Sequence, residues 1–201
     1  MSNKLSPLLI ALEKSYESIA KKTGAPKATL VISRKTGNTM GHWTSLAVWS
    51  NGQDKYNELM ISGDYLDRTS EELLGTLLHE IAHAINTAKG VKDCSSNQYH
   101  NRNFKNEAEA LGLNTKFSDG RGFATTTISE EGLNRWAKEL ELIKNAKNLS
   151  VPRQVVKTKG RDTNYKSYKC DCGYVIRMSK STYELSSPTC SICNESFRGV
   201  I

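Results

Sequence analysis

The chain has 201 residues, of which 37% are apolar and 24% charged, so it can bury one core with a small satellite beside it. Its fourteen glycines and four prolines exclude a collagen-like or disordered composition, and no apolar run approaches the roughly 20 residues of a membrane span. The apolar stretch near the start is too short for a signal peptide. We therefore expect a cytoplasmic protein with no membrane partner.

The positive charge is concentrated in the last quarter of the sequence. Residues 1–150 hold 19 basic and 17 acidic residues, whereas residues 151–201 hold 9 basic and 4 acidic ones, which together give the net charge of +7. This imbalance favours a polyanionic partner, nucleic acid first. A solvated tail that keeps the protein soluble accounts for the charge equally well.

The first half of the chain predicts one helix and a small sheet. Ser6 and Pro7 are typical of an N-cap and a first helical position, and Gly24 of the residue after a helix. Short β-branched or alternating runs at residues 28–33, 45–50 and 57–63 then predict strands. We expect these strands to form an antiparallel sheet.

Helices dominate the following segment. Thr69 and Glu72 form a capping box for a long helix that ends at Lys89 and Gly90. Its apolar stripe consists of Leu74, Leu77, Leu78, Ile81 and Ile85. A helix at about 101–111, a hairpin with its turn at 119–122 and a helix beginning at Ser129 follow. The core stripe of that last helix is Leu133, Trp136, Leu140 and Ile143.

The most informative motif lies in the middle of the long helix. His79 and His83 are four residues apart, so both imidazoles can reach one metal ion, while Glu80 is offset around the helix and can address a water molecule. This H-E-x-x-H pattern is typical of zinc hydrolases in which the glutamate is the general base. A pair of helical histidines without a metal would produce the same short pattern.

A catalytic zinc ion needs a third protein ligand. His100 is favoured because histidine is the commonest metal ligand and because a chain reversal after Gly90 would bring it back over the metal. Glu107 and Glu109 are the alternatives. His42 is expected to be a loop histidine outside the site.

These residues resemble the SprT-like zinc metallopeptidases, a family that includes the DNA-dependent protease Spartan. The likeness rests on His79-Glu80-Ile81-Ala82-His83, on His100 with Phe104 as an H-x-x-x-[FW] element, and on residues 107–113. Asn101 stands where many members have glycine, as in some bacterial and phage-type relatives. The resemblance implies that His100 is the third zinc ligand.

The predicted helices and strands indicate an α+β fold, and periodicity is lost in the linker. A zincin-like metallopeptidase domain, with a small antiparallel sheet packed on the H-E-x-x-H helix, would occupy residues 1–147. A basic linker would occupy residues 148–166, and a small zinc ribbon residues 167–201. Ribbons end many SprT-like proteins.

Two cysteine pairs near the C-terminus predict the ribbon. The pairs Cys170 with Cys172 and Cys190 with Cys193 are separated by a short segment, and four thiolates from two turns suit a structural zinc ion. The C-x-C spacing of the first pair is tighter than the usual C-x-x-C. Reduced thiols or a disulfide are the alternatives, and Cys94 is expected to be a free thiol.

Cations and tyrosines alternate through the linker and the ribbon. Lys and Arg would contact phosphates there, and tyrosine rings could stack on unpaired bases. The candidate nucleic-acid-binding residues are Lys157, Lys159, Arg161, Lys166, Lys169 and Arg177. Tyr174 is expected in the ribbon core, whereas Tyr165 and Tyr168 could lie in the core or on the surface.

The leading hypothesis is a monomeric zinc endopeptidase with one catalytic and one structural Zn²⁺, in which Glu80 activates the water. The resemblance adds DNA-associated proteins as substrates, with single-stranded or structured DNA bound without sequence specificity near the nucleoid. Tyr99 and Arg102 flank His100 and could stabilise an oxyanion. The alternatives are a DNA-binding adaptor with a structural metallopeptidase fold and, less well supported, an HNH-type nuclease.

Overall fold

The chain forms two compact units in the computed structural model, which describes residues 5–34, 39–148 and 165–199. The division between the units falls between residues 155 and 156. The predicted linker at 148–166 lies almost wholly outside the described residues, because residues 149–164 are not among them. Tyr165 and Lys166, which the prediction assigns to the linker, belong instead to the first strand of the second unit.

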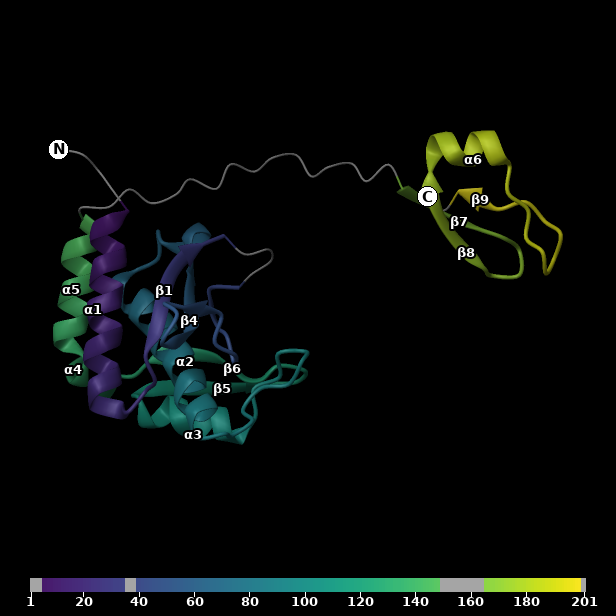
Figure 1. The fold of residues 1–201 in the computed structure, drawn as a ribbon. Helices are drawn as coiled ribbons and strands as arrows, with labels where there is room; N and C mark the ends of the chain where they lie inside the picture. The colour runs from purple at the N-terminus through teal and green to yellow at the C-terminus, as the bar shows by residue number, and fades with distance from the viewer. Residues whose placement is uncertain (1–4, 35–38, 149–164, 200–201) are drawn as a thin grey trace. The chain divides into compact units, whose positions relative to one another are not determined.

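The first unit has an α+β fold, as predicted (Figure 1). Its helices are α1 (Ser6–Thr23), α2 (Ser70–Ala88), α3 (Arg102–Ala110), α4 (Glu130–Arg135) and α5 (Ala137–Asn148), with the short 3-10 helix η1 (Gly63–Tyr65) before α2. Its strands are β1 (Ala28–Ser33), β2 (Gly41–Trp43), β3 (Trp49–Ser50), β4 (Lys55–Ser62), β5 (Leu113–Ser118) and β6 (Gly122–Ile128).

Helix α2 supplies much of the core. The predicted capping box is present, because the Thr69 side chain accepts from the backbone N–H of Glu72 and the Glu72 carboxylate accepts from that of Thr69. The helix ends where predicted, before Gly90 in the left-handed region. Its largest fully buried side chains are Leu73, Leu74, Leu77, Leu78 and Ile81. Each of them stabilises the fold by roughly 2 kcal/mol through burial.

The prediction of an antiparallel sheet is wrong in one pairing. Strand β4 lies between β1 and β2, and it runs parallel to β1 but antiparallel to β2 and β3. The reason is that β2 and β3 intervene in the chain between β1 and β4. The chain reverses direction before β4, which pairs antiparallel with β2 and β3 on one edge and parallel with β1 on the other. Strand β2 is left at the edge of the sheet, and it contacts α2.

The hairpin of β5 and β6 is confirmed, whereas the single final helix is wrong. The helix is interrupted at Trp136, whose fully buried indole donates to the carbonyl of Leu111 at 2.8 Å. Helix α5 then lies beside α1 (Figure 1). At the start of α1, Leu5 rather than Ser6 is the N-cap, while Gly24 ends the helix as predicted.

The second unit is a three-stranded antiparallel sheet with one helix. Its elements are β7 (Tyr165–Lys169), β8 (Val175–Ser179), α6 (Lys180–Ser186) and β9 (Arg198–Gly199), with strand order β8-β7-β9. Tyr168 is in its core and stacks on Tyr183 with ring centroids 3.9 Å apart. Tyr174, predicted in the core, is 60% exposed because it lies in the turn between β7 and β8.

None of the helices in the described part of the chain is both long and apolar enough to span a membrane.

Candidate metal centre

Three histidines from two segments of the first unit converge on one point. His79 and His83 lie one turn apart on α2, and His100 lies directly before α3. The Nε2 atom of His100 is 3.2 Å from Nε2 of His79 and 3.1 Å from Nε2 of His83. The three rings thus form a candidate metal-binding cluster.

The other residues considered as ligands lie elsewhere. Glu107 accepts a hydrogen bond from Lys89 at 2.5 Å, and Glu109 accepts one from Thr115 at 2.7 Å. His42 is exposed and lies on β2, so the prediction of a loop position is wrong, although its place outside the cluster agrees with the prediction. The chain reversal between α2 and α3 therefore brings a histidine, not a carboxylate, to the other two imidazoles.

The outer nitrogen of His83 is fixed by a carboxylate. Its Nδ1 lies 2.9 Å from Oδ2 of Asp93, a residue of the loop after α2 that is only 8% exposed. The same oxygen accepts a hydrogen bond from the buried Asn86 side chain at 3.0 Å. Because a carboxylate only accepts, Nδ1 of His83 carries the proton, and in the neutral ring Nε2 presents its lone pair to the cluster.

The other two imidazoles are oriented in a similar way. Nδ1 of His100 lies 2.9 Å from the carbonyl oxygen of Gln98, which again requires the proton on Nδ1. Nδ1 of His79 lies 3.1 Å from the hydroxyl of Thr126 on β6. Outer-sphere hydrogen bonds of this kind orient metal-ligating histidines.

The Nε2 lone pairs of the histidine cluster point toward one another, so a cation is the species that fits between them. Neutral rings whose Nε2 atoms face one another at 3.1–3.2 Å repel unless a positive charge lies between them. Burial lowers the pKa of His79 well below its ordinary value, an effect reinforced by the charges of His83 and His100. Burial, and then the His83 charge, lowers the pKa of His100 to about 4. A proton is therefore a poor occupant for these two rings at neutral pH, and a metal ion a good one.

His83 has the opposite tendency. Burial lowers its pKa, but the hydrogen bond from Nδ1 to Asp93 and the charges of Glu80 and Asp93 raise it on balance. The carboxylate that raises the pKa of the ring also increases its basicity toward a metal ion.

Two further contacts hold the cluster in shape. The fully buried ring of Phe104 lies against all three imidazoles, with centroids 4.5–4.7 Å away. The backbone N–H of His100 donates to the carbonyl of Arg121, and the N–H of Phe123 donates to the carbonyl of His100. The hairpin of β5 and β6 thereby fixes the position of the third histidine.

Glu80 is 5% exposed and lies on α2 between the two histidines of the motif. Its negative charge helps to raise the pKa of His83.

Tyr99 and Arg102, which flank His100, differ in their surroundings. The ring of Tyr99 packs against Gly122, whereas Arg102 is exposed in the first turn of α3.

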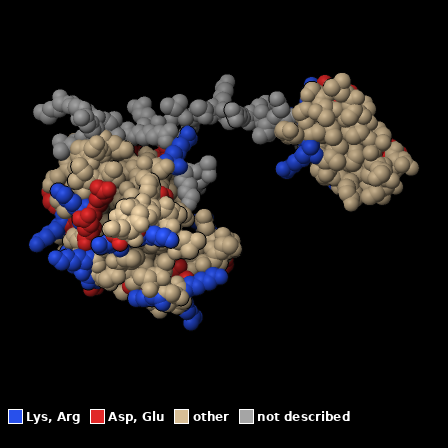
Figure 2. Space-filling model, viewed as in Figure 1, with Lys and Arg blue, Asp and Glu red and all other residues tan. Residues whose placement is uncertain are grey.

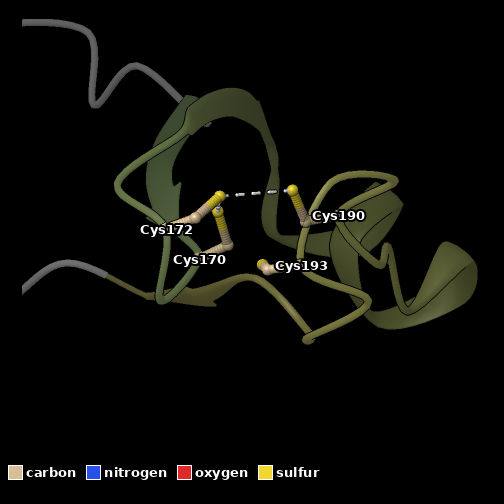
Figure 3. Close-up of side chains that lie close together, drawn as sticks. All are labelled: Cys170, Cys172, Cys190 and Cys193. Carbon is tan, nitrogen blue, oxygen red and sulfur yellow. Dashed lines mark hydrogen bonds between the residues drawn. The ribbon is translucent and has the colours of Figure 1, made fainter.

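The second unit contains a separate cysteine cluster. The Sγ atoms of Cys170 and Cys172 are 3.2 Å apart, and those of Cys172 and Cys190 are 3.7 Å apart. Cys193 lies beside them, and all four sulfurs can reach one ion (Figure 3). The sequence predicted this grouping from the spacing of the two pairs.

Two tight turns bring these thiols together. Gly173 adopts a left-handed conformation at φ 95° and donates to the carbonyl of Cys170, which permits the short C-x-C spacing. The backbone N–H groups of Cys193 and Ile192 lower the pKa of the Cys190 thiol. A thiolate at this position is suited to binding a metal ion.

One face of the second unit's sheet is exposed and basic. The register places Tyr165 and Lys169 of β7, Arg177 of β8 and Arg198 of β9 on the face opposite Tyr168 and the core. We call these four residues the basic face. All are exposed, and Arg198 also lies 3.5 Å from Asp171. On the face of the first unit that Figure 2 shows, Lys and Arg are interspersed with Asp and Glu.

The basic face includes only part of the predicted nucleic-acid-binding set. Lys166 is opposite Met178, on the other side of the sheet. The remaining three predicted residues, Lys157, Lys159 and Arg161, lie outside the described residues.

Comparison with protein families gives one match. The model of the SprT-like family matches residues 8–127, which is more than half of the chain and runs from α1 to β6. The matched range contains all three histidines of the cluster and Glu80, and it ends before the second unit. No curated protein and no solved structure matches the chain.

Proposed function

The chain belongs to the SprT-like family, and from this premise we propose that it is a zinc-dependent endopeptidase with a zincin-like first unit. The observation that carries the proposal is the convergence of three imidazole nitrogens whose outer nitrogens are already hydrogen-bonded. His79, His83 and His100 would hold the ion. Zinc bound there would polarise the carbonyl group of the substrate and lower the pKa of a water molecule to about 7.

Glu80 is the general base of the proposed reaction. Its carboxylate accepts the proton of the attacking water and later delivers it to the amine of the departing peptide, so that the proton is conserved. Because the side chain is 5% exposed and lies next to the histidine cluster, bulk water competes weakly for this proton transfer.

The substrate of this reaction is an extended polypeptide. Strand β2 contacts α2 near Glu80, and within the described residues its edge away from β4 pairs with no strand. An extended chain can add to such an edge through main-chain hydrogen bonds. This addition would place a peptide bond beside the cluster without requiring a particular side chain.

The second unit would direct the enzyme to proteins held on DNA. A structural zinc ion on the four cysteines would stabilise this small unit as a ribbon. The basic face offers three cations to phosphates and the exposed ring of Tyr165 to an unpaired base. These contacts read no sequence, so single-stranded or otherwise unpaired DNA of any sequence is the expected partner.

Cleavage of a basic DNA-binding protein, with and without single-stranded DNA, tests the proposal. We expect DNA to stimulate cleavage, and Glu80→Gln to lower it by at least about 100-fold while the zinc content stays unchanged. Glu71→Gln is the matched control, since Glu71 is exposed on the same helix.

Each result has a distinct meaning. Absence of cleavage by the zinc-loaded wild-type protein would reject the peptidase and favour the adaptor. Cleavage that does not depend on DNA would keep the peptidase but reject the role of the second unit.

A further inference from the structure

Strand β2 packs directly on the side chain of the proposed general base. A methyl group added at Gly41 would lie 2.6 Å from Oε1 and 2.8 Å from Cγ of Glu80, and 2.9 Å from Cγ2 of Thr76. Real Cβ atoms essentially never show contacts this short. The absence of a side chain at Gly41 is therefore what leaves room for the carboxylate.

The backbone conformation does not explain this glycine. Gly41 is not in the left-handed region, where seven other glycines of the described residues are found, and as part of a regular strand it pairs with Ile61. Any residue could adopt its dihedral angles. The space occupied by Glu80 and Thr76 is the remaining reason for a glycine at this position.

Both sides of the contact are held in place. On the strand side, the carbonyl of Met40 accepts from the N–H of Ser62 on β4. On the helix side, Thr76 lies one turn before Glu80 and accepts from Arg68 at 3.0 Å. Neither the strand nor the helix can retreat without breaking hydrogen bonds, so the Glu80 side chain is the part that would move.

We propose that Gly41 is a positioning residue, which sets the location of the Glu80 carboxylate relative to the histidine cluster. The proposal rests on the proposed function for its kinetic consequence. It assigns to the sheet edge a role beyond pairing, because the same strand that borders the substrate determines where the base lies. Displacing a catalytic group by about 1 Å can cost roughly 100-fold in rate.

The test is Gly41→Ala, with Gly75→Ala as the control. Gly75 lies on the same helix as Glu80, and a methyl group there would only reach the backbone nitrogen of Ile128 at 3.9 Å. We expect Gly41→Ala to lower kcat by about 10- to 100-fold with KM and zinc content unchanged, and Gly75→Ala to leave all three unchanged.

A double-mutant cycle separates positioning from general damage. In a Glu80→Gln background, Gly41→Ala should cost no further activity, because both changes act on one group. A Gly41→Ala protein with wild-type kcat, or one that loses zinc in parallel with activity, would overturn the proposal. If Gly41→Ala folds poorly, adding Thr76→Ser removes the contact with Cγ2 and keeps the one with Glu80.

Crystal structures of both alanine variants give a readout that does not depend on activity. We expect the Glu80 side chain to be displaced in Gly41→Ala and unmoved in Gly75→Ala. A wild-type protein without peptidase activity would reject the proposed function, and these structures would still decide the positioning role. An unmoved Glu80 in Gly41→Ala would overturn it.

Discussion

Oδ2 of Asp93 lies 2.9 Å from Nδ1 of His83, and it also accepts a hydrogen bond from the side chain of Asn86. The carboxylate thus links a proposed metal ligand to a buried amide one turn further along α2. It fixes which nitrogen of His83 carries the proton, and it keeps the ring aimed at the other two histidines.

Asp93→Ala should weaken zinc binding by about 10- to 100-fold, because the outer partner of a ligating histidine sets its orientation and basicity. Competition with a chromophoric chelator measures the affinity. Asp119→Ala is the control, since Asp119 is exposed in the turn of the hairpin. Equal affinities for the two variants would show that Asp93 does not support the site.

Gly122→Ala should disrupt the site from the hairpin side. Gly122 has φ 61°, and a methyl group there would lie 2.0 Å from the carbonyl oxygen of His100. We expect a loss of more than about 2 kcal/mol in unfolding free energy together with weaker zinc binding. Gly120→Ala, at φ 77° with no atom within 4 Å, should cost only about 1 kcal/mol and leave zinc binding intact.

The sequence predicts the inner residues of the cluster better than their supports. His79 and His83 follow from helical spacing, and His100 from the reversal after Gly90 together with the chemistry of histidine. Asp93 and Gln98 do not follow, because they lie in an irregular loop whose path depends on a left-handed conformation at Gln98, with φ 63°. No periodicity marks such a loop.

The sheet is a second case in which a local sequence pattern does not predict the tertiary arrangement. The strand at 28–33 was predictable from its own residues, but its parallel pairing with β4 depends on where a distant segment inserts. Trp136 is another example: its place in an apolar stripe predicts burial but not the hydrogen bond to Leu111 that accompanies the helix break. Local patterns predicted the helices and the strands at 28–33 and 57–63. They missed β2 at Gly41–Trp43, and the strand predicted at 45–50 is present only at Trp49–Ser50, because short strands depend on the partner they pair with.

The metal-free protein should lose stability as the pH falls. His79 and His100 have lowered pKa values in the folded state, so below pH 6.5 the unfolded chain takes up protons that these folded rings do not. Stability is therefore full above pH 6.5 and lost toward pH 4. From pH 7 to pH 5, the pKa of about 4 for His100 alone implies a loss of about 2 kcal/mol. His83, whose pKa is raised, offsets part of this loss.

Urea denaturation in the presence of a chelator, followed by tryptophan fluorescence, measures this effect in the first unit, which contains all three tryptophans. His100→Gln should show a smaller difference between pH 7 and pH 5, because one titrating ring is removed. His42→Gln is the control, as His42 is exposed. An unchanged difference in His100→Gln would contradict the assignment.

The two units should bind zinc independently. Cys190→Ser removes one thiol of the cysteine cluster, so we expect the zinc content to fall from two ions per chain to one. The fluorescence-detected unfolding of the first unit should not change. Elemental analysis gives the zinc content, and Lys180→Gln, exposed on α6 and outside both clusters, should retain both ions. Loss of both ions in Cys190→Ser would show that the sites are coupled.

Replacing Lys169, Arg177 and Arg198 together with glutamine should weaken binding of single-stranded DNA, because the three cations of the basic face are lost. Each phosphate contact removed should lower the slope of log affinity against log salt by about 0.7. Titration by fluorescence anisotropy at several salt concentrations measures this slope. Lys166→Gln removes a charge from the opposite side of the same strand and should leave most of the affinity. If Lys166→Gln weakens binding as much as the charge-matched Lys169→Gln, net charge rather than the basic face attracts the DNA.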